Sequence, residues 1–174
     1  MWSFLILIYT VYMHLTHTFP IYINEDSTIL ILGSFPSVKS REQMFYYGHP
    51  QNRFFKVLGS IFHEDVRNNI ESKKTFLKKH KISLYDVIEE CDIEGSADST
   101  IKNVTAIDLK TILRKYPNIH SIGLNGKKAS SLFKKYLEKD CSGVSIYHLP
   151  STSPANANCS LEELIKEYSK LFQK

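Results

Sequence analysis

The stretch TILILGSFPS, residues 28–37, decides how this chain folds. Its first five residues are apolar or β-branched and run without a break to Gly33, which is typical of a strand buried on both faces. The glycine, serine and proline residues at its end predict a tight turn. Because a strand buried on both faces belongs to a parallel sheet between two layers of helices, this stretch favours an α/β fold.

Strands and helices alternate through the rest of the chain. Short apolar runs predict three further strands, at 82–88, 119–124 and 144–149. Helical spacing and capping signals predict helices at 53–62, 68–81, 105–116, 127–137 and 161–172. Residues 89–103 carry Gly, Ser and Asp, so we expect a long loop there. Together these elements predict a three-layer α/β/α fold with a mainly parallel four-stranded sheet.

Length and composition exclude several classes of protein. The 174 residues, 43% hydrophobic and 23% charged, suit a globular domain and exclude a disordered or fibrous chain. Cys91, Cys141 and Cys159 form no C-x-x-C pair, which excludes a four-cysteine iron–sulfur site and argues against a zinc ribbon or disulfide framework. We therefore expect no metal and a reducing, cytoplasmic location. The net charge of +4 is compatible with a polyanionic partner.

The first 24 residues carry no charge, and the stretch 2–13 is almost wholly apolar. A secretory signal requires a positive residue before its apolar stretch, and none is present here. Polar residues from His14 onward interrupt the stretch before it reaches the length of a membrane span. Three interpretations stay open: upstream sequence before a true start at Met13, an apolar segment packed on the domain, or a weak membrane anchor. We divide the chain into an extension, 1–17, and a single domain, 18–174.

Ligands of open α/β sheets bind beyond the carboxyl ends of the strands, so the loops that follow the strands are candidate sites. In the first loop, Gly33 allows close approach to the backbone, and the amides after it can face an anionic or carbonyl group. Phe35, Tyr46 and Tyr47 offer faces on which a base could stack, or they could be core aromatics. His49 could position a polar group or be a satisfied structural histidine.

Asn52 directly precedes an expected helix and permits two interpretations. Asn is among the best N-cap residues, so its side chain could simply begin the helix. Alternatively, its carboxamide carbonyl could orient a water molecule. These roles need different side-chain directions, and the sequence leaves both open. Asp86, near the end of the second expected strand, could likewise read the edge of a base or cap a turn.

The last loop, LPSTSPANA at 149–157, combines small hydroxyl residues with rigid prolines. Its amides and hydroxyls suit contacts to phosphates, although the same composition suits a plain turn before a capped helix. The lysines at 73–79 and 127–135 could form a face for a polyanion or a solvated helix surface. The chain has no phosphate-binding loop, dinucleotide-binding fingerprint or nucleophile elbow. The residues alone thus predict a polar, aromatic-walled cleft.

Three segments together, ILILGSFPSVKSRE, YYGHPQNRFFKVLG and LPSTSPANA, resemble the hypoxanthine-DNA glycosylases of the uracil-DNA glycosylase superfamily. HPQNRFF is also similar to the mismatch-specific uracil-DNA glycosylases. The resemblance extends from about residue 18 to the C-terminus. It implies the same parallel four-stranded sheet and the hydrolysis, without a cofactor, of the bond between deoxyribose and a deaminated base, chiefly hypoxanthine. We expect a monomer that acts on DNA without an obligate protein partner.

The resemblance also implies roles for individual residues. Related families place an acidic or amide residue two positions after the first motif's glycine to handle the attacking water, and this position is Phe35 here. The water would instead be held by Asn52. Leu149 stands where related families often have a histidine, with His148 one residue earlier and expected to face the other way. Asp86 stands where uracil enzymes have a base-reading Asn, which argues against ordinary uracil recognition.

These roles define an expected site. The flipped base would contact Gly33, Ser34, Phe35, Tyr47, His49 and Asp86, and the DNA backbone would contact Gly126, Lys127, Ser151, Thr152 and Ser153. No lysine is placed for Schiff-base chemistry, so we expect a monofunctional enzyme. The alternatives are a mismatch-specific uracil-DNA glycosylase, a damaged-DNA-binding protein without catalysis, and a small nucleotide- or phosphate-binding α/β protein. The second alternative follows from Phe35, which stands where an acidic residue would handle the water.

Overall fold

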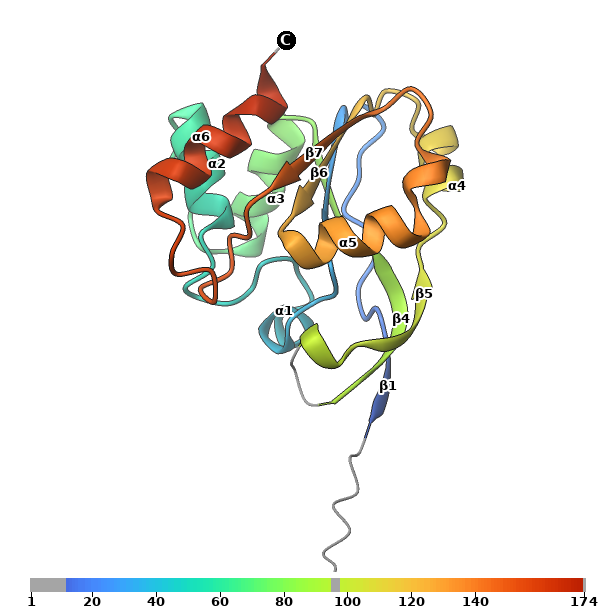
Figure 1. The fold of residues 1–174 in the computed structure, drawn as a ribbon. Helices are drawn as coiled ribbons and strands as arrows, with labels where there is room; N and C mark the ends of the chain where they lie inside the picture. Colours follow the sequence, from blue (N-terminus) through green and yellow to red (C-terminus); the bar gives the residue numbers. More distant parts are fainter. Residues whose placement is uncertain (1–11, 95–97, 174) are drawn as a thin grey trace, which may run out of the picture.

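The computed structural model describes residues 12–94 and 98–173 (Figure 1). Most of the apolar stretch at 2–13 therefore lies outside the described residues. No helix in the described part of the chain has the length and apolar character that crossing a membrane requires.

A four-stranded parallel sheet forms the centre of the molecule, in agreement with the expected fold. Its strands are β2 (Ile29–Gly33), β3 (Ile82–Asp86), β6 (Ser121–Asn125) and β7 (Ser145–Leu149), in the order β3-β2-β6-β7. Every residue of β2 is buried, as its uninterrupted apolar sequence predicts. The register pairs Gly33 with Asp86 and Asn125 with Leu149, so the last residues of neighbouring strands lie side by side.

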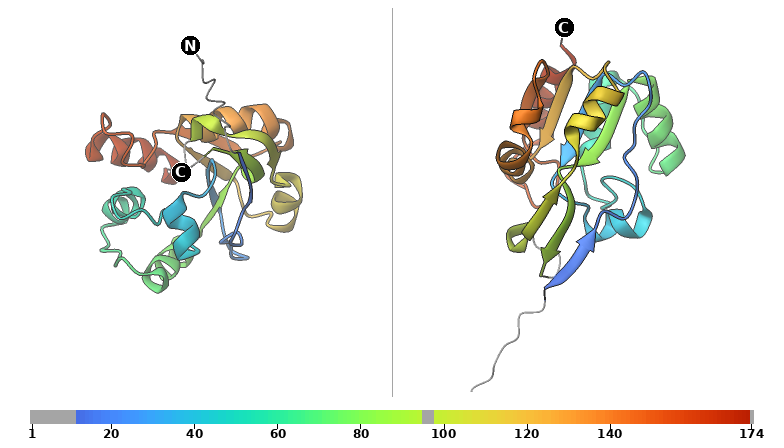
Figure 2. Two further views of the ribbon diagram at one scale, coloured as in Figure 1. Left: turned by 90° about the horizontal axis from the view of Figure 1, so that it is seen from below. Right: turned by 90° about the vertical axis from the view of Figure 1, so that its right-hand side faces the viewer.

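Helices cover both faces of this sheet (Figures 1 and 2). One face packs against α2 (Phe54–Phe62), α3 (Ile70–Lys79) and α6 (Leu161–Ser169), and the other against α4 (Leu109–Lys115) and α5 (Lys127–Tyr136). Side chains alternate along β2, so Ile29 and Ile31 belong to the first core and Leu30 and Leu32 to the second.

Local signals set the helix boundaries. The expected capping box is confirmed at α6, where Ser160 accepts from the backbone of Glu163 and the Glu163 side chain accepts from the backbone of Ser160. Asn69 caps α3 by a single bond, in which its side-chain oxygen accepts from the backbone N–H of Ser72. Short helices complete the structure: α1 (Val38–Gln43), η1 (Asp98–Thr100), η2 (Glu138–Asp140) and η3 (Lys170–Phe172).

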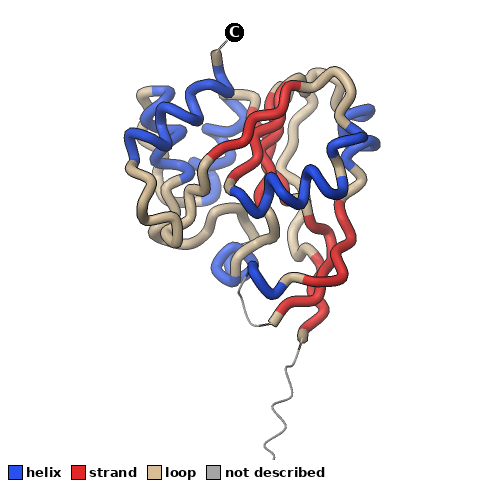
Figure 3. The backbone as a smooth tube through the Cα atoms, viewed as in Figure 1, coloured by secondary structure: helices blue, strands red, loops and turns tan. Residues whose placement is uncertain are grey.

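A second sheet corrects the expectation of a long loop at 89–103. Strands β1 (Met13–Thr16), β4 (Ile88–Ile93) and β5 (Lys102–Ala106) form an antiparallel sheet in the order β1-β4-β5 (Figure 3). The expected helix at 105–116 consequently begins only at Leu109, after the cap residue Asp108. Strand β4 shows no regular alternation of burial, and its partner β1 is distant in sequence, so no local pattern announces the pairing.

The small sheet and α1 lie beyond the carboxyl ends of the parallel strands (Figure 1). Both contribute residues to the same hollow as the strand ends, through Ile93 of β4 and Lys39 of α1. This edge of the sheet, where ligands of such folds bind, is therefore enclosed from several sides.

Candidate functional site

A cavity of about 580 Å³ lies at the carboxyl ends of the parallel strands. This volume is within the usual range for small-molecule sites. All of the residues that the sequence predicted for the site line this cavity: Gly33, Ser34, Phe35, Tyr47, His49, Asn52, Asp86, Gly126, Lys127, Ser151, Thr152 and Ser153. The structure thus brings the three separate sequence segments together around one space.

Asn52 lines the cavity and also supports the start of α2. Its Oδ1 accepts a hydrogen bond of 2.9 Å from the backbone N–H of Phe54. A carbonyl oxygen has two lone pairs, so this bond leaves acceptor capacity on Oδ1 and fixes the plane of the carboxamide. The cap residue of α2 is Arg53, which makes no side-chain cap bond, so the expectation that Asn52 is the N-cap is wrong by one position. The bond to Phe54 nevertheless orients the amide at the cavity wall.

The three aromatic residues of the first loop differ in their surroundings. Tyr46 also lines the cavity, but it is a core residue: it is 3% exposed, and its hydroxyl donates to the carbonyl oxygen of Pro20 at 3.0 Å. Tyr47 stacks on Phe54 with ring centroids 3.8 Å apart and lines the cavity. Its backbone has φ of 53°, an uncommon value for a non-glycine residue. Phe35 is 8% exposed and also lines the cavity.

His49 has a defined tautomer in its neutral form. Its Nδ1 accepts from the backbone N–H of Gln51 at 3.1 Å. Because a neutral imidazole has one N–H, the hydrogen then lies on Nε2. His49 can therefore supply a hydrogen-bond donor at the cavity wall.

Asp86 is the last residue of β3 and lies beside Gly33, the last residue of β2. A Cβ at Gly33 would come within 2.3 Å of Asp86 Oδ1, so only glycine leaves room for this carboxyl group. Burial raises the pKa of Asp86, and a hydrogen bond and the charge of His17 act in the opposite direction. Asp86 thus places a desolvated carboxyl group, held by a histidine, in the cavity wall.

The loop after β7 is organised by its own hydroxyl groups. Ser151 Oγ accepts from the N–H of Ser153, and Ser153 Oγ accepts from the N–H of Ala155. In each case the hydroxyl hydrogen is still available to a ligand. These contacts keep two serine O–H donors at the cavity.

The turn between β6 and α5 fixes this loop against the sheet. Asn125 donates from Nδ2 to Thr152 Oγ1 at 3.0 Å and accepts from Thr152 N–H at 3.1 Å. Gly126 has φ of +97°, and a Cβ there would lie 3.0 Å from Cβ of Ser151, so this position suits glycine. The last residues of β6 and the phosphate-binding candidates after β7 therefore form one unit.

Arg53 is a residue that sequence reasoning missed. Its guanidinium donates to the carbonyl oxygens of Ser153, Asn156 and Cys159. Its backbone N–H donates to the carbonyl oxygen of Thr152. It adjoins Asn52, so it ties the loop after β7 to the start of α2. Its place in HPQNRFF is the only local signal, because its partners lie about a hundred residues away.

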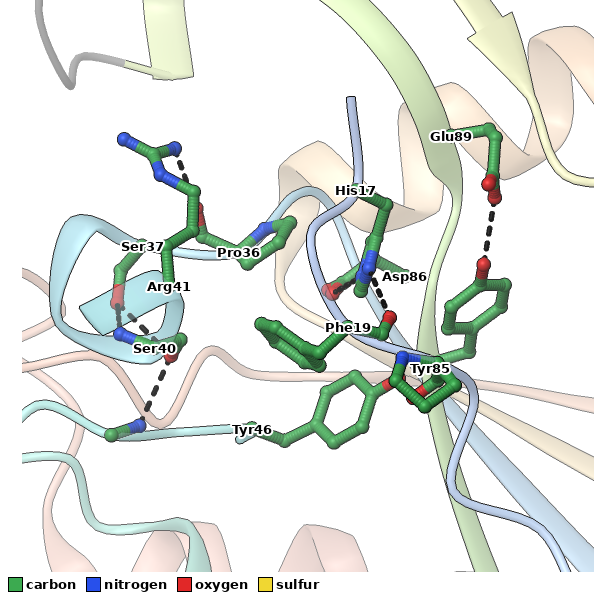
Figure 4. A network of polar contacts seen from close by, with 12 residues as sticks. His17, Phe19, Pro36, Ser37, Ser40, Arg41, Tyr46, Tyr85, Asp86 and Glu89 are labelled. Carbon is green, nitrogen blue, oxygen red and sulfur yellow. Dashed lines mark hydrogen bonds and ion pairs between the residues drawn. The ribbon is translucent and has the colours of Figure 1, made fainter. Parts of the chain in front are cut away.

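The wall of the cavity is positively charged. Lys39, Arg41, Lys127 and Lys128 line it, and Asp86 is the one carboxylate among the described lining residues. On α1, the Arg41 guanidinium donates to the carbonyl oxygen of Pro36 at 3.1 Å (Figure 4), and Lys39 pairs with Glu42 at 2.7 Å. This distribution suits an anionic ligand around the mouth.

Two further observations bear on the chemistry of the site. Within residues 12–94 and 98–173, no three His, Cys, Asp or Glu side chains gather as they would around a metal ion. His148 is exposed on β7 and Leu149 is 5% exposed, so the two residues face opposite ways, as expected. His148 is not among the residues that line the cavity.

Both the sequence and the fold of this chain are similar to those of known proteins. Residues 20–173 match the family model described as the uracil DNA glycosylase superfamily. A curated hypoxanthine DNA glycosylase from Methanosarcina barkeri (strain Fusaro / DSM 804) is 39% identical over 112 residues, which are 64% of this chain and 71% of that protein. A hypoxanthine DNA glycosylase from Methanosarcina acetivorans is 35% identical over 143 residues, covering 82% of this chain and 89% of that protein.

The structural comparison agrees. The solution NMR structure of a Methanosarcina acetivorans protein, described as a candidate uracil DNA glycosylase, has a TM-score of 0.77 and 32% sequence identity. The match covers 92% of this chain and 100% of that one.

Proposed function

This chain belongs to the uracil DNA glycosylase superfamily, and we propose that it is a monofunctional hypoxanthine DNA glycosylase that acts on deoxyinosine in DNA. The family resemblance drawn from the sequence motifs is confirmed by the matched residues. Both curated relatives are named hypoxanthine DNA glycosylases. The observation that carries the proposal is that Asn52, Asp86 and Tyr47 line one cavity at the ends of the strands.

The substrate nucleotide must leave the duplex to reach this cavity. Flipping costs a few kcal/mol and least for a mispaired base, so inosine opposite thymine is an accessible target. The lysines and arginine at the mouth and the hydroxyls of Ser151 and Ser153 would hold the flanking phosphates. These contacts fix the position of the DNA but carry no base selectivity.

The base would be recognised inside the cavity. Phe35 or Tyr47 stacks on its ring, and Asp86 accepts a hydrogen bond from N1–H of hypoxanthine. The backbone amides that follow Gly33 donate to O6, where negative charge develops as the purine leaves. A 6-oxopurine fits this site because it has a hydrogen-bond donor at N1, facing Asp86, and an acceptor at O6, facing the backbone amides.

Asn52 would hold the attacking water. The glycosidic bond breaks through an oxocarbenium-like sugar, by analogy with glycoside hydrolysis. A neutral carboxamide is a poor base, so Asn52 contributes by positioning the water rather than by abstracting its proton. We therefore expect modest turnover by a protein that works as a monomer.

An excision assay on a duplex with one deoxyinosine, followed by alkali to cut abasic sites, tests the proposal. We expect cleavage by the wild type and a loss of about 10²-fold or more in Asn52→Ala. Asn52→Asp keeps an acceptor for Phe54 N–H and separates the loss of the amide from a loss of the helix start. Asn69→Ala is the matched control, because Asn69 makes the same kind of bond, to Ser72 N–H, at α3.

Two outcomes of this assay would contradict the proposal. Faster cutting of a G·U duplex than of any inosine duplex would favour the mismatch-specific uracil enzyme. DNA binding in a gel shift without strand scission after alkali would favour a damaged-DNA-binding protein.

A further inference from the structure

A histidine outside the sequence motifs binds the carboxyl group of Asp86. His17 follows β1 and precedes the residues that match the family model, and its side chain is 0% exposed. Its Nε2 lies 2.9 Å from Asp86 Oδ2, and its Nδ1 lies 2.7 Å from the carbonyl oxygen of Phe19 (Figure 4). Both ring nitrogens therefore make hydrogen bonds, Nδ1 to a backbone carbonyl oxygen and Nε2 to a carboxyl oxygen.

The contact with Phe19 fixes where the protons lie. A backbone carbonyl oxygen can only accept, so Nδ1 of His17 carries a hydrogen. If the ring is neutral, Nε2 is an acceptor, and Asp86 must be protonated on Oδ2 to make the observed bond. If the ring is an imidazolium, Nε2–H donates to the Asp86 carboxylate. In both states, one hydrogen lies between Nε2 and Oδ2.

The other oxygen of Asp86 has the same character in both states. Oδ1 carries no hydrogen in either, so it can only accept. It lies beside Gly33, and Asp86 and Gly33 both line the cavity. The cavity wall therefore presents a hydrogen-bond acceptor whichever partner holds the shared proton.

We propose that His17 is a positioning residue that keeps Asp86 an acceptor toward the flipped base and so selects purines that carry N1–H over adenine. The inference rests on the proposed function. Hypoxanthine has a donor at N1, whereas N1 of adenine is an acceptor and would face Oδ1 without a hydrogen. A site with such a buried polar mismatch rejects the wrong base strongly. Guanine shares N1–H with hypoxanthine, so His17 does not discriminate between these two.

Aromatic and ionisable groups from several elements face the pair. The His17 ring packs against Phe19 and Tyr85 at 4.7 and 4.8 Å between centroids, and more distantly against Tyr46 and Phe35. Burial raises the pKa of the phenols that face Asp86, namely Tyr46, Tyr47 and Tyr85, so they stay neutral. Glu89 of β4 faces this cluster through the bond that it accepts from the Tyr85 hydroxyl.

The test compares single-turnover excision by wild type, His17→Phe and His17→Gln between pH 5 and 9. Each protein is given duplexes that carry deoxyinosine, deoxyadenosine or deoxyguanosine. We expect His17→Phe to lose inosine excision by about tenfold or more at neutral pH. The acidic limb of its pH profile should move to higher pH, because a buried carboxyl without its histidine takes up a proton more readily. His17→Gln keeps a donor and should recover part of the rate.

Selectivity gives a second readout that a purely structural role would not move. Once Asp86 can present an O–H to the base, excision of adenine relative to hypoxanthine should rise in His17→Phe, while the ratio of guanine to hypoxanthine stays constant. In the wild type, ¹⁵N NMR of His17 should show a protonated Nδ1.

The possible outcomes separate this inference from the proposed function. An active wild type with unchanged rates and pH profiles in both variants overturns the role of His17 alone, and so does an unprotonated Nδ1. A wild type that leaves inosine intact overturns the proposed function and this inference with it. If circular dichroism shows that His17→Phe is unfolded, His17→Gln and the NMR signal decide.

Discussion

Gly33 has no room for a side chain, because the Asp86 carboxyl group occupies the space beside its Cα. This contact explains why the first motif needs glycine at the end of a strand whose backbone is otherwise regular. It also means that the position of the Asp86 carboxyl, which we propose reads the base, depends on the residue opposite it in the neighbouring strand.

Gly33→Ala should therefore impair excision more than folding. The new methyl group, 2.3 Å from Asp86 Oδ1, must displace the carboxyl, and we expect single-turnover inosine excision to fall about 10²-fold. Overpacking should cost about 1–3 kcal/mol in unfolding free energy. Gly143→Ala is the control, since nothing lies within 4 Å of its Cβ although its φ is +80°. Equal losses of activity in the two variants would argue against the displacement of Asp86.

Asp86 and His17 also predict how stability depends on pH. Burial raises the folded pKa of Asp86, so its contribution to stability is complete below the unfolded pKa and is lost as pH rises through the folded pKa. Without His17, the folded pKa should rise further, and the loss should continue to higher pH. Urea unfolding of wild type and His17→Phe should thus show a difference that grows from pH 4 to pH 8. A difference in unfolding free energy that does not depend on pH would contradict this linkage.

At the scale of elements, the conformation of the loop between β7 and α6 depends on Arg53, the cap residue of α2. Arg53 offers a planar fork of donors, and three carbonyl oxygens of the loop accept from it. The loop carries Ser151 and Ser153, so its conformation decides whether their hydroxyls can meet a phosphate.

Arg53→Lys should loosen this loop. A lysine keeps the charge but lacks the fork, so the unfolding free energy should fall by about 1.5–3 kcal/mol. Affinity for DNA should fall as well, and limited proteolysis should cut between 150 and 160 faster than in the wild type. Arg67→Lys, a change at an exposed arginine, serves as the control. An unaltered cleavage rate would show that the loop holds its shape without the guanidinium.

Local sequence patterns predict the strands and helices whose boundaries are set by residues close to them in the sequence. β2 could be predicted from the sequence because four consecutive apolar residues that end at a glycine are typical of a doubly buried strand. α6 could be read because its capping box is four residues long. By contrast, β4 and β5 were missed because β4 pairs with β1, 74 to 80 positions away, and register shifts interrupt its pairing with β5. The glycine predicted to allow close approach, Gly33, is required where it stands, because Asp86 occupies the space beside it.

The same reasoning separates the predictable from the unpredictable part of the site. Many of the residues that line the cavity lie in loops that follow strands. They could be predicted from three separate segments because ligands of such folds bind at the carboxyl ends of the strands. His17, Arg53 and Asn125 act through partners that only the folded chain brings near. His17 in particular lies in the segment assigned to the extension, 1–17, and its partner Asp86 is 69 residues away.

At the scale of the whole molecule, charge is distributed unevenly. The net charge of +4 is small, yet four cations and a single described carboxylate line the cavity. Glu42 pairs with Lys39 of this wall, whereas Glu64 and Glu167 pair with lysine and histidine side chains that do not line the cavity. This face should therefore attract a polyanion although the protein as a whole is only weakly basic.

DNA binding should report this asymmetry through its salt dependence. Each phosphate contact that is removed lowers the slope of log K against log salt by about 1, so Lys127→Gln with Lys128→Gln should reduce it by about 2. Lys56→Gln with Lys78→Gln removes the same charge from exposed helix positions that do not line the cavity, and its slope should match the wild type. Fluorescence anisotropy with an undamaged duplex between 50 and 200 mM salt measures both. Equal slopes for the two double variants would mean that the cavity mouth does not face the phosphates, because only charges in contact with the backbone release its counterions.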